Sequence, residues 1–224
     1  MPLINNPLSC SAAQAKLIAE KTSDPMFQHS HWSTDELQEL RSYIREHYRR
    51  EQKGICAYCK NPLSLVAANN AHVEHIAPKS LYFKFIFEPK NLCVICADCN
   101  IIKRDQETFN TIPNTVKPLQ EDRERKTYPR SSSAFLIVHP HFDNWDDHIQ
   151  KFGIRYTDIT EKGAFTISAC RLNRFFHKKL HMPEELVSDD ELIHQMRAFI
   201  DSDSAVGRAR VLEQLARMIS PMNI

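Results

Sequence analysis

Two pairs of cysteines, each with the spacing Cys-x-x-Cys, are the residues of this chain best suited to hold a metal. Cys56 and Cys59 form the first pair, and Cys96 and Cys99 form the second about forty residues later. Each such turn can present two thiolates to one ion, and two turns complete the tetrahedron of a structural zinc site. The alternative is four buried thiols without metal, since free cysteine packs as a small hydrophobe. The repeated spacing favours zinc.

Each Cys-x-x-Cys turn is called a knuckle here. Cys93 makes the second knuckle ambiguous, because Cys93, Cys96 and Cys99 contain two overlapping ones. The chain has seven cysteines, an odd number, and five of them lie in one stretch, so a disulfide framework is the poorer explanation. Cys10 and Cys170 have no cysteine near them in the sequence and are expected to be inert.

The segment between the knuckles and just after them carries the other candidate residues. Its register resembles that of the HNH endonucleases of the zinc-knuckle branch. In these, an acidic residue and His precede Pro, Asn-Leu follows, and the second knuckle continues into Asn-x-x-Lys. The matching positions are Glu74, His75, Pro78, Asn91, Leu92, Asn100 and Lys103. The resemblance covers about fifty of the 224 residues, and its register assigns Cys96 rather than Cys93 to the metal.

The resemblance implies a ββα-metal fold, in which two short strands and a helix hold one catalytic divalent cation. Glu74 and Asn100 would supply oxygen ligands to Mg²⁺ or Mn²⁺, which prefer such ligands. His75 would be the general base that deprotonates the attacking water, because an imidazole can be neutral near pH 7. The ion would polarise the scissile phosphate and stabilise the leaving oxygen.

Two further roles follow from the same resemblance. Asn91 would orient the loop that carries His75, and Lys103, one turn beyond Asn100, would meet a backbone phosphate. Glu74 stands where the family more often has Asp, and Asn100 where many members have His. Both departures keep an oxygen that a hard cation accepts.

Each of these residues, taken singly, has a structural explanation as a strand end, a turn residue or a helix cap. Only the joint pattern points to catalysis. His72 shares a strand face with Glu74 by the period of two, and a structural role for it is favoured over phosphate binding. A non-catalytic zinc ribbon that binds nucleic acid or protein is the alternative function, but such a module has no use for Glu74 and Asn100.

A weaker resemblance extends over more of the chain. The motif His-x-Glu-His-x-x-Pro-Lys-Ser, the helical arm before it and a later IVHPHFDNWDDHI segment are similar to the HNH subunits of Septu-type and retron-associated anti-phage systems. That family works with a separate ATPase, which suits a chain whose four glycines form no phosphate-binding loop. The resemblance therefore implies an effector nuclease in an anti-phage defence complex with an ATPase, acting foremost on DNA, with RNA as the alternative.

The later segment contains several residues that could form a site by composition alone. We expect them to form a structural turn, with a partner-facing surface as the alternative. Trp32 and Trp145 are expected in the core, and the alternative is that they are anchors for a partner. The residues of the segment are His139, His141, Asp143 and His148.

Composition excludes several classes of protein. About 42% hydrophobic and 25% charged residues are ordinary for a folded chain, so wholesale disorder and fibrous classes are excluded. No apolar run approaches the roughly 18 residues that span a bilayer, and the N-terminus lacks a signal-peptide pattern, so a cytoplasmic protein without a membrane span is expected. A net charge of +1 predicts modest non-specific affinity for nucleic acid.

The elements that must position these residues suggest an α+β chain with three regions. We expect an N-terminal helical arm over residues 1–53, a nuclease core over 54–110, and a linker with a C-terminal α/β region over 111–224 that binds a partner. The polar linker itself is expected over roughly 104–133.

Local patterns predict the individual elements. The arm should hold a helix over 11–21 and another that starts at a capping box between Ser33 and Glu36 and stops at Gly54. The basic side chains of this second helix are expected to form a solvated face. Further predictions are a strand over 71–76, a helix after Asn100, a strand over 134–140, a hairpin over 152–169 that turns near 161–163, and closing helices from about Leu172, Asp189 and Ser204.

Overall fold

The computed structural model describes most of the chain and has an α+β fold, in agreement with the sequence. The described residues are 1–64, 70–110, 127–179, 198–199, 202 and 204–219. The predicted helix from about Asp189 and most of the predicted linker lie outside these ranges. In the described part of the chain, no helix is long and apolar enough to cross a membrane.

The centre of the fold is a two-stranded antiparallel sheet followed by a short helix. β1 (His72–His75) pairs with β2 (Leu92–Ile95), and α3 (Ala97–Lys103) begins shortly after β2 ends. The register sets Glu74 opposite Cys93. All of β2 is buried, whereas only the second half of β1 is buried. The second half of β1 therefore carries the Glu-His pair into the interior.

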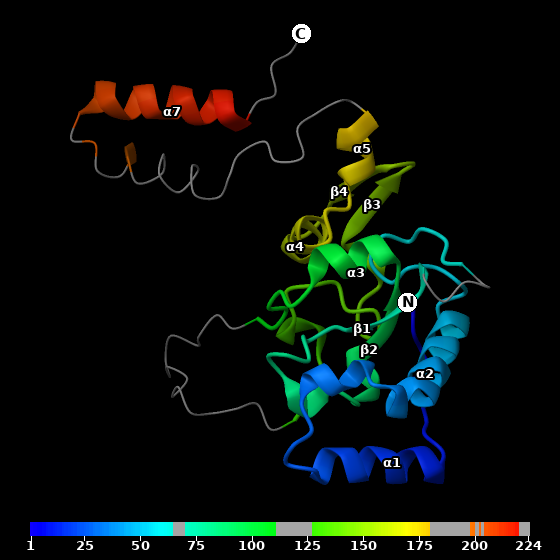
Figure 1. Ribbon diagram of the computed structural model, residues 1–224. Helices are drawn as coiled ribbons and strands as arrows, with labels where there is room; N and C mark the ends of the chain where they lie inside the picture. Colours follow the sequence, from blue (N-terminus) through cyan, green and yellow to red (C-terminus); the bar gives the residue numbers. More distant parts are fainter. Residues whose placement is uncertain (65–69, 111–126, 180–197, 200–201, 203, 220–224) are drawn as a thin grey trace. The chain divides into compact units, whose positions relative to one another are not determined.

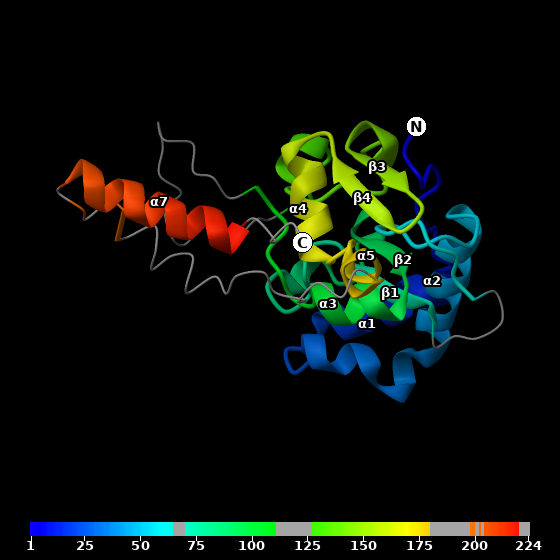
Figure 2. The ribbon, with the colours of Figure 1, turned by 90° about the horizontal axis from the view of Figure 1, so that it is seen from above.

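Within the unit that contains this sheet, two helices of the N-terminal region lie on one side of it, and the hairpin and helix between Ile149 and Ala169 lie on the other (Figures 1 and 2). α1 (Ala12–Ser23) begins with a capping box between Ser11 and Gln14. α2 (Gln38–Glu51) packs against both strands. The side chains that it buries are Leu40, Ile44, Tyr48 and Arg49.

The start of α2 differs from the prediction. The hydroxyl of Ser33 donates to the carbonyl of Ser30 at 3.1 Å instead of capping a helix. A 3-10 turn over Asp35–Leu37 leads into α2, and its Leu37 backbone N–H donates to the carbonyl of Thr34 at 3.2 Å. The predicted stop is correct, because Gly54 follows the helix in the left-handed conformation with φ of 70°.

A hairpin forms, but over Ile149–Asp158 and not over the predicted 152–169, and its turn lies elsewhere. β3 (Ile149–Phe152) pairs with β4 (Arg155–Asp158), and the chain turns at Gly153, which has φ of 61°. Residues 161–163 were expected at the turn and instead open a helix. The glycine at 153 supplies the left-handed conformation that a tight turn requires.

That helix is α4 (Glu161–Ala169), and its start explains why residue 163 is glycine. The Thr160 side chain caps the helix by accepting a hydrogen bond from the Gly163 backbone at 3.2 Å. A Cβ added to Gly163 would lie 1.9 Å from the carbonyl oxygen of His148. Glycine therefore serves close packing of α4 against the backbone here, and does not mark a turn.

The predicted strand over 134–140 does not form. Phe135 makes only an isolated bridge with Phe109, and the Leu136 backbone donates to the carbonyl of Thr108 at 2.7 Å. The run is apolar because Phe135, Ile137 and Val138 are buried in the core, which an irregular segment achieves as well as a strand.

Contacts along the chain define two compact units, Met1–Leu172 and Asn173–Ile224. The expected boundaries near residues 53 and 110 do not appear as divisions between units, since residues 127–172 belong with the first unit. The second unit contains α5 (Arg174–Lys179) and α7 (Ala205–Ile219), which start near the predicted positions at 172 and 204.

Candidate zinc and catalytic sites

The four cysteines of the two knuckles meet at one buried point. The sulfur atoms of Cys56, Cys59, Cys96 and Cys99 all lie within 4.8 Å of one another, and those of Cys59 and Cys96 are 3.8 Å apart. A tetrahedral ion with Zn–S bonds of about 2.3 Å would set its sulfurs about 3.8 Å apart. The four sulfurs are soft donors, they are buried, and their spacing matches that of a structural zinc site.

Local backbone geometry builds the cluster. The Cys56 backbone N–H donates to the carbonyl of Asn61 at 2.9 Å, and the Ala57 N–H donates to that of Val94 at 3.1 Å, which fastens the first knuckle to β2. The second knuckle stands at the N-terminus of α3. Cys93 is buried on β2 and lies outside the four-sulfur cluster found among the described residues.

Cys170 is less isolated than its sequence suggests. It is buried, and its thiol lies close to that of Cys99. The cluster therefore has a fifth sulfur beside it, supplied by the end of α4.

The segment after residue 140 holds the first knuckle from outside. The Trp145 indole N–H donates to the carbonyl of Tyr58 at 2.9 Å, and the Tyr156 hydroxyl donates to that of Cys59 at 2.7 Å. The Lys151 ammonium donates to the Asn61 side chain at 2.7 Å. Trp145 is thus a core residue, and Trp32 is buried as well. No local pattern in the chain predicts these long-range contacts.

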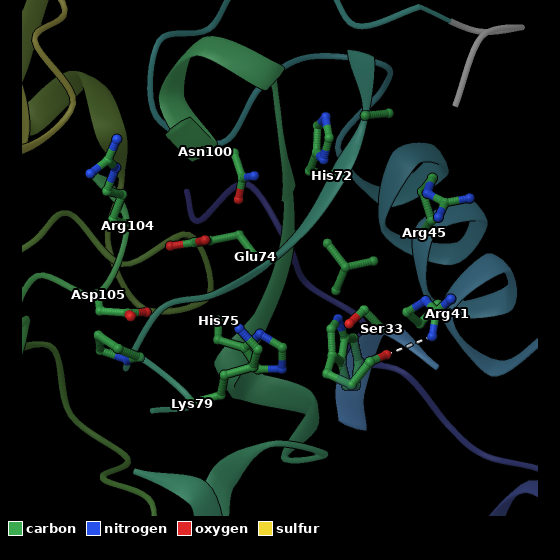
Figure 3. Close-up of a pocket in the computed structure, with 14 residues that line it drawn as sticks. Ser33, Arg41, Arg45, His72, Glu74, His75, Lys79, Asn100, Arg104 and Asp105 are labelled. Carbon is green, nitrogen blue, oxygen red and sulfur yellow. Dashed lines mark hydrogen bonds between the residues drawn. The ribbon is translucent and has the colours of Figure 1, made fainter. Parts of the chain in front are cut away.

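A cavity of about 600 Å³ lies beside β1 and α2, apart from the sulfur cluster (Figure 3). It brings together three of the predicted catalytic residues, Glu74, His75 and Asn100. In Figure 3 the amide oxygen of Asn100 points towards the Glu74 carboxylate. Other lining residues are Trp32, Ser33, Arg41, Arg45, His72, Lys79, Arg104 and Asp105.

Glu74 is a buried carboxylate with a buried counter-charge. The Lys103 ammonium lies 2.5 Å from Glu74 Oε1, and Lys103 is fully buried. Burial raises the pKa of Glu74, and the charge of Lys103 acts in the opposite direction. The Tyr58 hydroxyl also points to Oε1, at 3.5 Å, so both contacts reach the same oxygen.

This arrangement corrects the expectation for Lys103. It was expected to meet a backbone phosphate, but its ammonium has no exposure and also donates to the carbonyl of His75 at 3.4 Å. Lys103 therefore acts inside the protein, on the charge of Glu74, and not at a surface that a nucleic acid could reach.

His75 is held in one tautomer. Its Nε2 lies 3.0 Å from the carbonyl oxygen of Ile86, which can only accept, so Nε2 carries the proton and Nδ1 is the basic nitrogen. The ring of Trp32 packs edge-on against it with centroids 4.5 Å apart. Burial, together with the nearby charge of Lys79, lowers the pKa of His75 to about 3. His75 is neutral throughout the physiological pH range.

Asn91 fixes the loop that follows β1. Its side-chain oxygen accepts from the Ala77 backbone at 2.7 Å, and its amide donates to the carbonyls of Ala77 at 3.1 Å and Phe85 at 3.0 Å. Asn91 has no exposed surface. Because the same loop contains Ile86, which binds His75, Asn91 indirectly fixes the partner of the imidazole.

The histidine-rich segment at 139–148 is an internal turn. The Asp143 carboxylate accepts from the His139 backbone at 2.6 Å and from the Lys162 ammonium at 2.8 Å. His139 contacts the Tyr128 hydroxyl at 2.9 Å, and His141 Nε2 donates to the carbonyl of Leu92 at 2.8 Å. Three of its four named residues are buried, the exception being His148. These contacts serve the fold, which favours the structural reading of this segment.

Several residues of the cavity are not predicted by any motif in the sequence. Arg41 and Arg45 lie on the face of α2 that was expected to be solvated, and Lys79 and Arg104 face the same cavity. The spacing of four between Arg41 and Arg45 was the available signal, but most surface helices show it too.

Comparisons with protein-family models, with curated proteins and with solved structures found no match for this chain. Its function must therefore be argued from the residues and the geometry described above.

Proposed function

We propose that this chain is a metal-dependent endonuclease of the HNH type, which hydrolyses phosphodiester bonds of nucleic acid and is stabilised by a structural zinc ion. The observation that carries the proposal is the shared cavity of Glu74, His75 and Asn100, surrounded by basic side chains and separate from the sulfur cluster. A ribbon that merely binds zinc needs the four cysteines, but it has no need of a second site rich in oxygen ligands.

A divalent cation would be held by Glu74 and by the amide oxygen of Asn100. Glu74 Oε2 is available for this, because the contacts from Lys103 and Tyr58 both reach Oε1. Mg²⁺ or Mn²⁺ suits such oxygen ligands and, when bound, polarises the scissile phosphate and stabilises the leaving oxygen. The charge of Lys103 opposes the effect of burial on the pKa of Glu74 and so favours the ionised carboxylate.

His75 acts as the general base in this proposal. The Ile86 carbonyl keeps the proton on Nε2, so Nδ1 can accept the proton of the attacking water. An imidazole with a pKa of about 3 is a weak base. A phosphate bound in the cavity offsets the positive charge of Lys79 and raises the basicity of Nδ1 when substrate is present.

The biological setting that we propose rests on the sequence. DNA is the proposed substrate and RNA is the alternative, because both offer the phosphates that the basic side chains of the cavity would contact. An ATPase subunit of an anti-phage defence complex is the proposed partner, because the chain has no phosphate-binding loop of its own.

The test is cleavage of plasmid DNA and of structured RNA with Mg²⁺, Mn²⁺ or no added cation, with and without any co-encoded ATPase. His75→Ala should lower the rate by about 10²–10⁴-fold, as is typical when a general base is deleted. His72→Ala, which changes another histidine of the same cavity, is the matched control and should keep most of the activity. Cleavage by His75→Ala within a few-fold of the unmodified chain would show that the base lies elsewhere.

The buried ion pair favours a second candidate, a binding module that holds nucleic acid without cutting it. Lys103 already neutralises Glu74, and a carboxylate neutralised in this way attracts a cation less strongly. The same assay separates the two functions, because the binding module retains nucleic acid under every cation condition and never cleaves it.

A further inference from the structure

Three arginines of α2 follow one another at intervals of four residues, and two of them line the cavity. Arg41 and Arg45 face it, and Arg49 is buried one turn further on. Arg41 is fixed by its guanidinium, whose Nη1 donates to the carbonyls of Trp32 at 2.5 Å and Thr34 at 2.6 Å. Its position is therefore set by backbone atoms and not by a counter-ion.

The guanidinium of Arg45 has a hydrogen-bond donor without an acceptor. Its Nε is buried and has no hydrogen-bond partner. Burial and the positive charges of Arg49 and Arg41 lower its pKa. A buried guanidinium N–H without an acceptor is costly, so the Arg45 side chain gains from a movement that lets an anion in the cavity accept from it.

The positive charges of Arg41 and Arg45 are not offset by an ion pair within α2. Glu46, the acidic residue next to Arg45, forms its ion pairs with Arg49 and Arg50. Among the residues that the structure describes, neither Arg41 nor Arg45 has an acidic partner within 4 Å. An electropositive wall of this kind attracts an anion.

The opposite side of the cavity carries one arginine, Arg104, beside the acidic Asp105. Figure 3 shows Arg41 and Arg45 on one side and Arg104 on the other, with Glu74 and His75 between them. A chain of phosphates would meet positive charge on both sides of the candidate catalytic residues. A single small anion would need only one of these groups.

We propose that Arg41 and Arg45 bind the phosphates that neighbour the cleaved phosphate of the same DNA strand. The strand then runs along α2 across the cavity. Residues four apart on a helix are about 6 Å apart along its axis, which lets the two guanidinium groups serve different phosphates of one strand. Arginine is suited to this role because its planar fork donates two parallel hydrogen bonds to a phosphate. Arg41 and Arg45 would thus form a binding track for the substrate of the proposed nuclease. The choice of DNA as that substrate rests on the proposed function.

Binding rather than cleavage tests this inference. The full chain is titrated onto a fluorescein-labelled DNA duplex, with fluorescence anisotropy as the readout, in buffer without added divalent cation and at several NaCl concentrations. Arg45→Gln is compared with Arg50→Gln. Arg50 lies on the same helix, does not line the cavity, and bonds to Glu46 at 3.0 Å. Zinc content and the unfolding midpoint of each variant confirm that the fold is intact.

We expect Arg45→Gln to weaken binding by about tenfold, the scale of one charge-assisted hydrogen bond to phosphate. The slope of log K against log salt concentration should also fall by about 1, because one phosphate contact is lost. Arg50→Gln should change neither value.

Equal affinity and equal salt slope for the two variants would overturn the inference, and so would an unmodified chain that does not bind the duplex. The outcome is separate from that of the cleavage assay. If Arg45→Gln weakens binding, Arg50→Gln does not, and the unmodified chain does not cleave, the binding track is correct and the nuclease proposal is wrong. If the unmodified chain cleaves but Arg45→Gln binds normally, the nuclease proposal is correct and the binding track is wrong.

Discussion

A carboxylate that is to hold a cation must remain ionised, and in a buried place this requires a compensating charge. Glu74 is buried, and Lys103 supplies that charge from within the protein at 2.5 Å. The lysine is itself fully buried, so each member of the pair depends on the other. Removal of one partner leaves an uncompensated charge, which costs far more than the pair contributes.

Lys103→Met should therefore lower the free energy of unfolding by about 3–5 kcal/mol, as is typical when one member of a buried pair is removed. Urea denaturation of the zinc-loaded protein measures this. The double variant Glu74→Gln with Lys103→Met should regain most of the loss, because no buried charge is left. Losses that simply add in the double variant would contradict a direct coupling between the two residues.

The four-sulfur cluster gives a second prediction about single residues. Cys96→Ser should abolish the zinc content of about one equivalent per chain, because it removes one of four ligands. Cys93→Ser should leave the content unchanged, since Cys93 lies outside the cluster. Elemental analysis of protein purified without chelators measures both, and loss of zinc from the Cys93 variant would mean that the overlapping knuckle binds the metal.

Local spacing explains which of these residues could be foreseen. Cys96 and Cys99 lie within one turn of chain, and Glu74 and His75 are adjacent, so sequence pattern alone placed them together. The pairing of Lys103 with Glu74 and the position of Arg45 in the cavity depend on how α2, α3 and β1 pack. A pattern within one element carries no information about such packing between elements.

At the scale of elements, the loop between β1 and β2 depends on one side chain. Asn91 satisfies three backbone groups of that loop from a position with no exposed surface. The loop also carries the Ile86 carbonyl that fixes the tautomer of His75. Asn91 thus acts on the proposed base through the backbone.

Asn91→Leu keeps the size of the side chain but leaves these backbone groups without partners. Each buried group left unsatisfied costs about 1–3 kcal/mol, so the free energy of unfolding should fall and cleavage should fall with it. Zinc content should stay at one equivalent, because Asn91 does not touch the sulfur cluster. Asn144→Leu, which removes an exposed hydrogen bond to Asp147, is the control. Unchanged cleavage by Asn91→Leu would contradict the positioning role.

The errors in element prediction have a common physical origin. The run over 134–140 is apolar and was predicted as a strand, but its side chains are buried by an irregular path next to Thr108 and Phe109. Gly163 was predicted in a turn, yet it is glycine because α4 approaches the backbone of His148. In both cases the residue type reports on burial or close approach, and neither property specifies one local conformation.

At the scale of the whole molecule, buried histidines link stability to pH. Burial lowers the pKa of His141 to about 4, and that of His139 well below its usual value. The unfolded chain takes up protons near pH 6.5, whereas the folded chain does so only at lower pH. Stability is therefore present above pH 6.5 and is lost as the pH falls from 6.5 towards 4.

For His141 alone this loss amounts to about 2 kcal/mol between pH 7 and pH 5. His141→Gln cannot titrate, so its free energy of unfolding should fall less steeply with decreasing pH than that of the unmodified chain. Urea denaturation at both pH values measures the difference. His47→Gln, which replaces a histidine that is not buried, is the control. Parallel pH profiles for His141→Gln and the unmodified chain would show that His141 is not responsible.

The longest-range feature is the dependence of the zinc knuckle on residues almost a hundred positions away. Trp145 and Tyr156 bond to the carbonyls of Tyr58 and Cys59, and contacts join residues 1–172 into one unit. A chain that ends at Leu172 should therefore keep its zinc and its cooperative thermal unfolding. A chain that ends at Asn110, where the sequence predicts the end of the core, should lose both, because the knuckle and the core facing Phe135 and Ile137 become exposed. Elemental analysis and circular dichroism on the two shortened chains measure this. If the chain ending at Asn110 retains zinc and the same unfolding midpoint, the C-terminal segment is an appendage and not part of the folded unit.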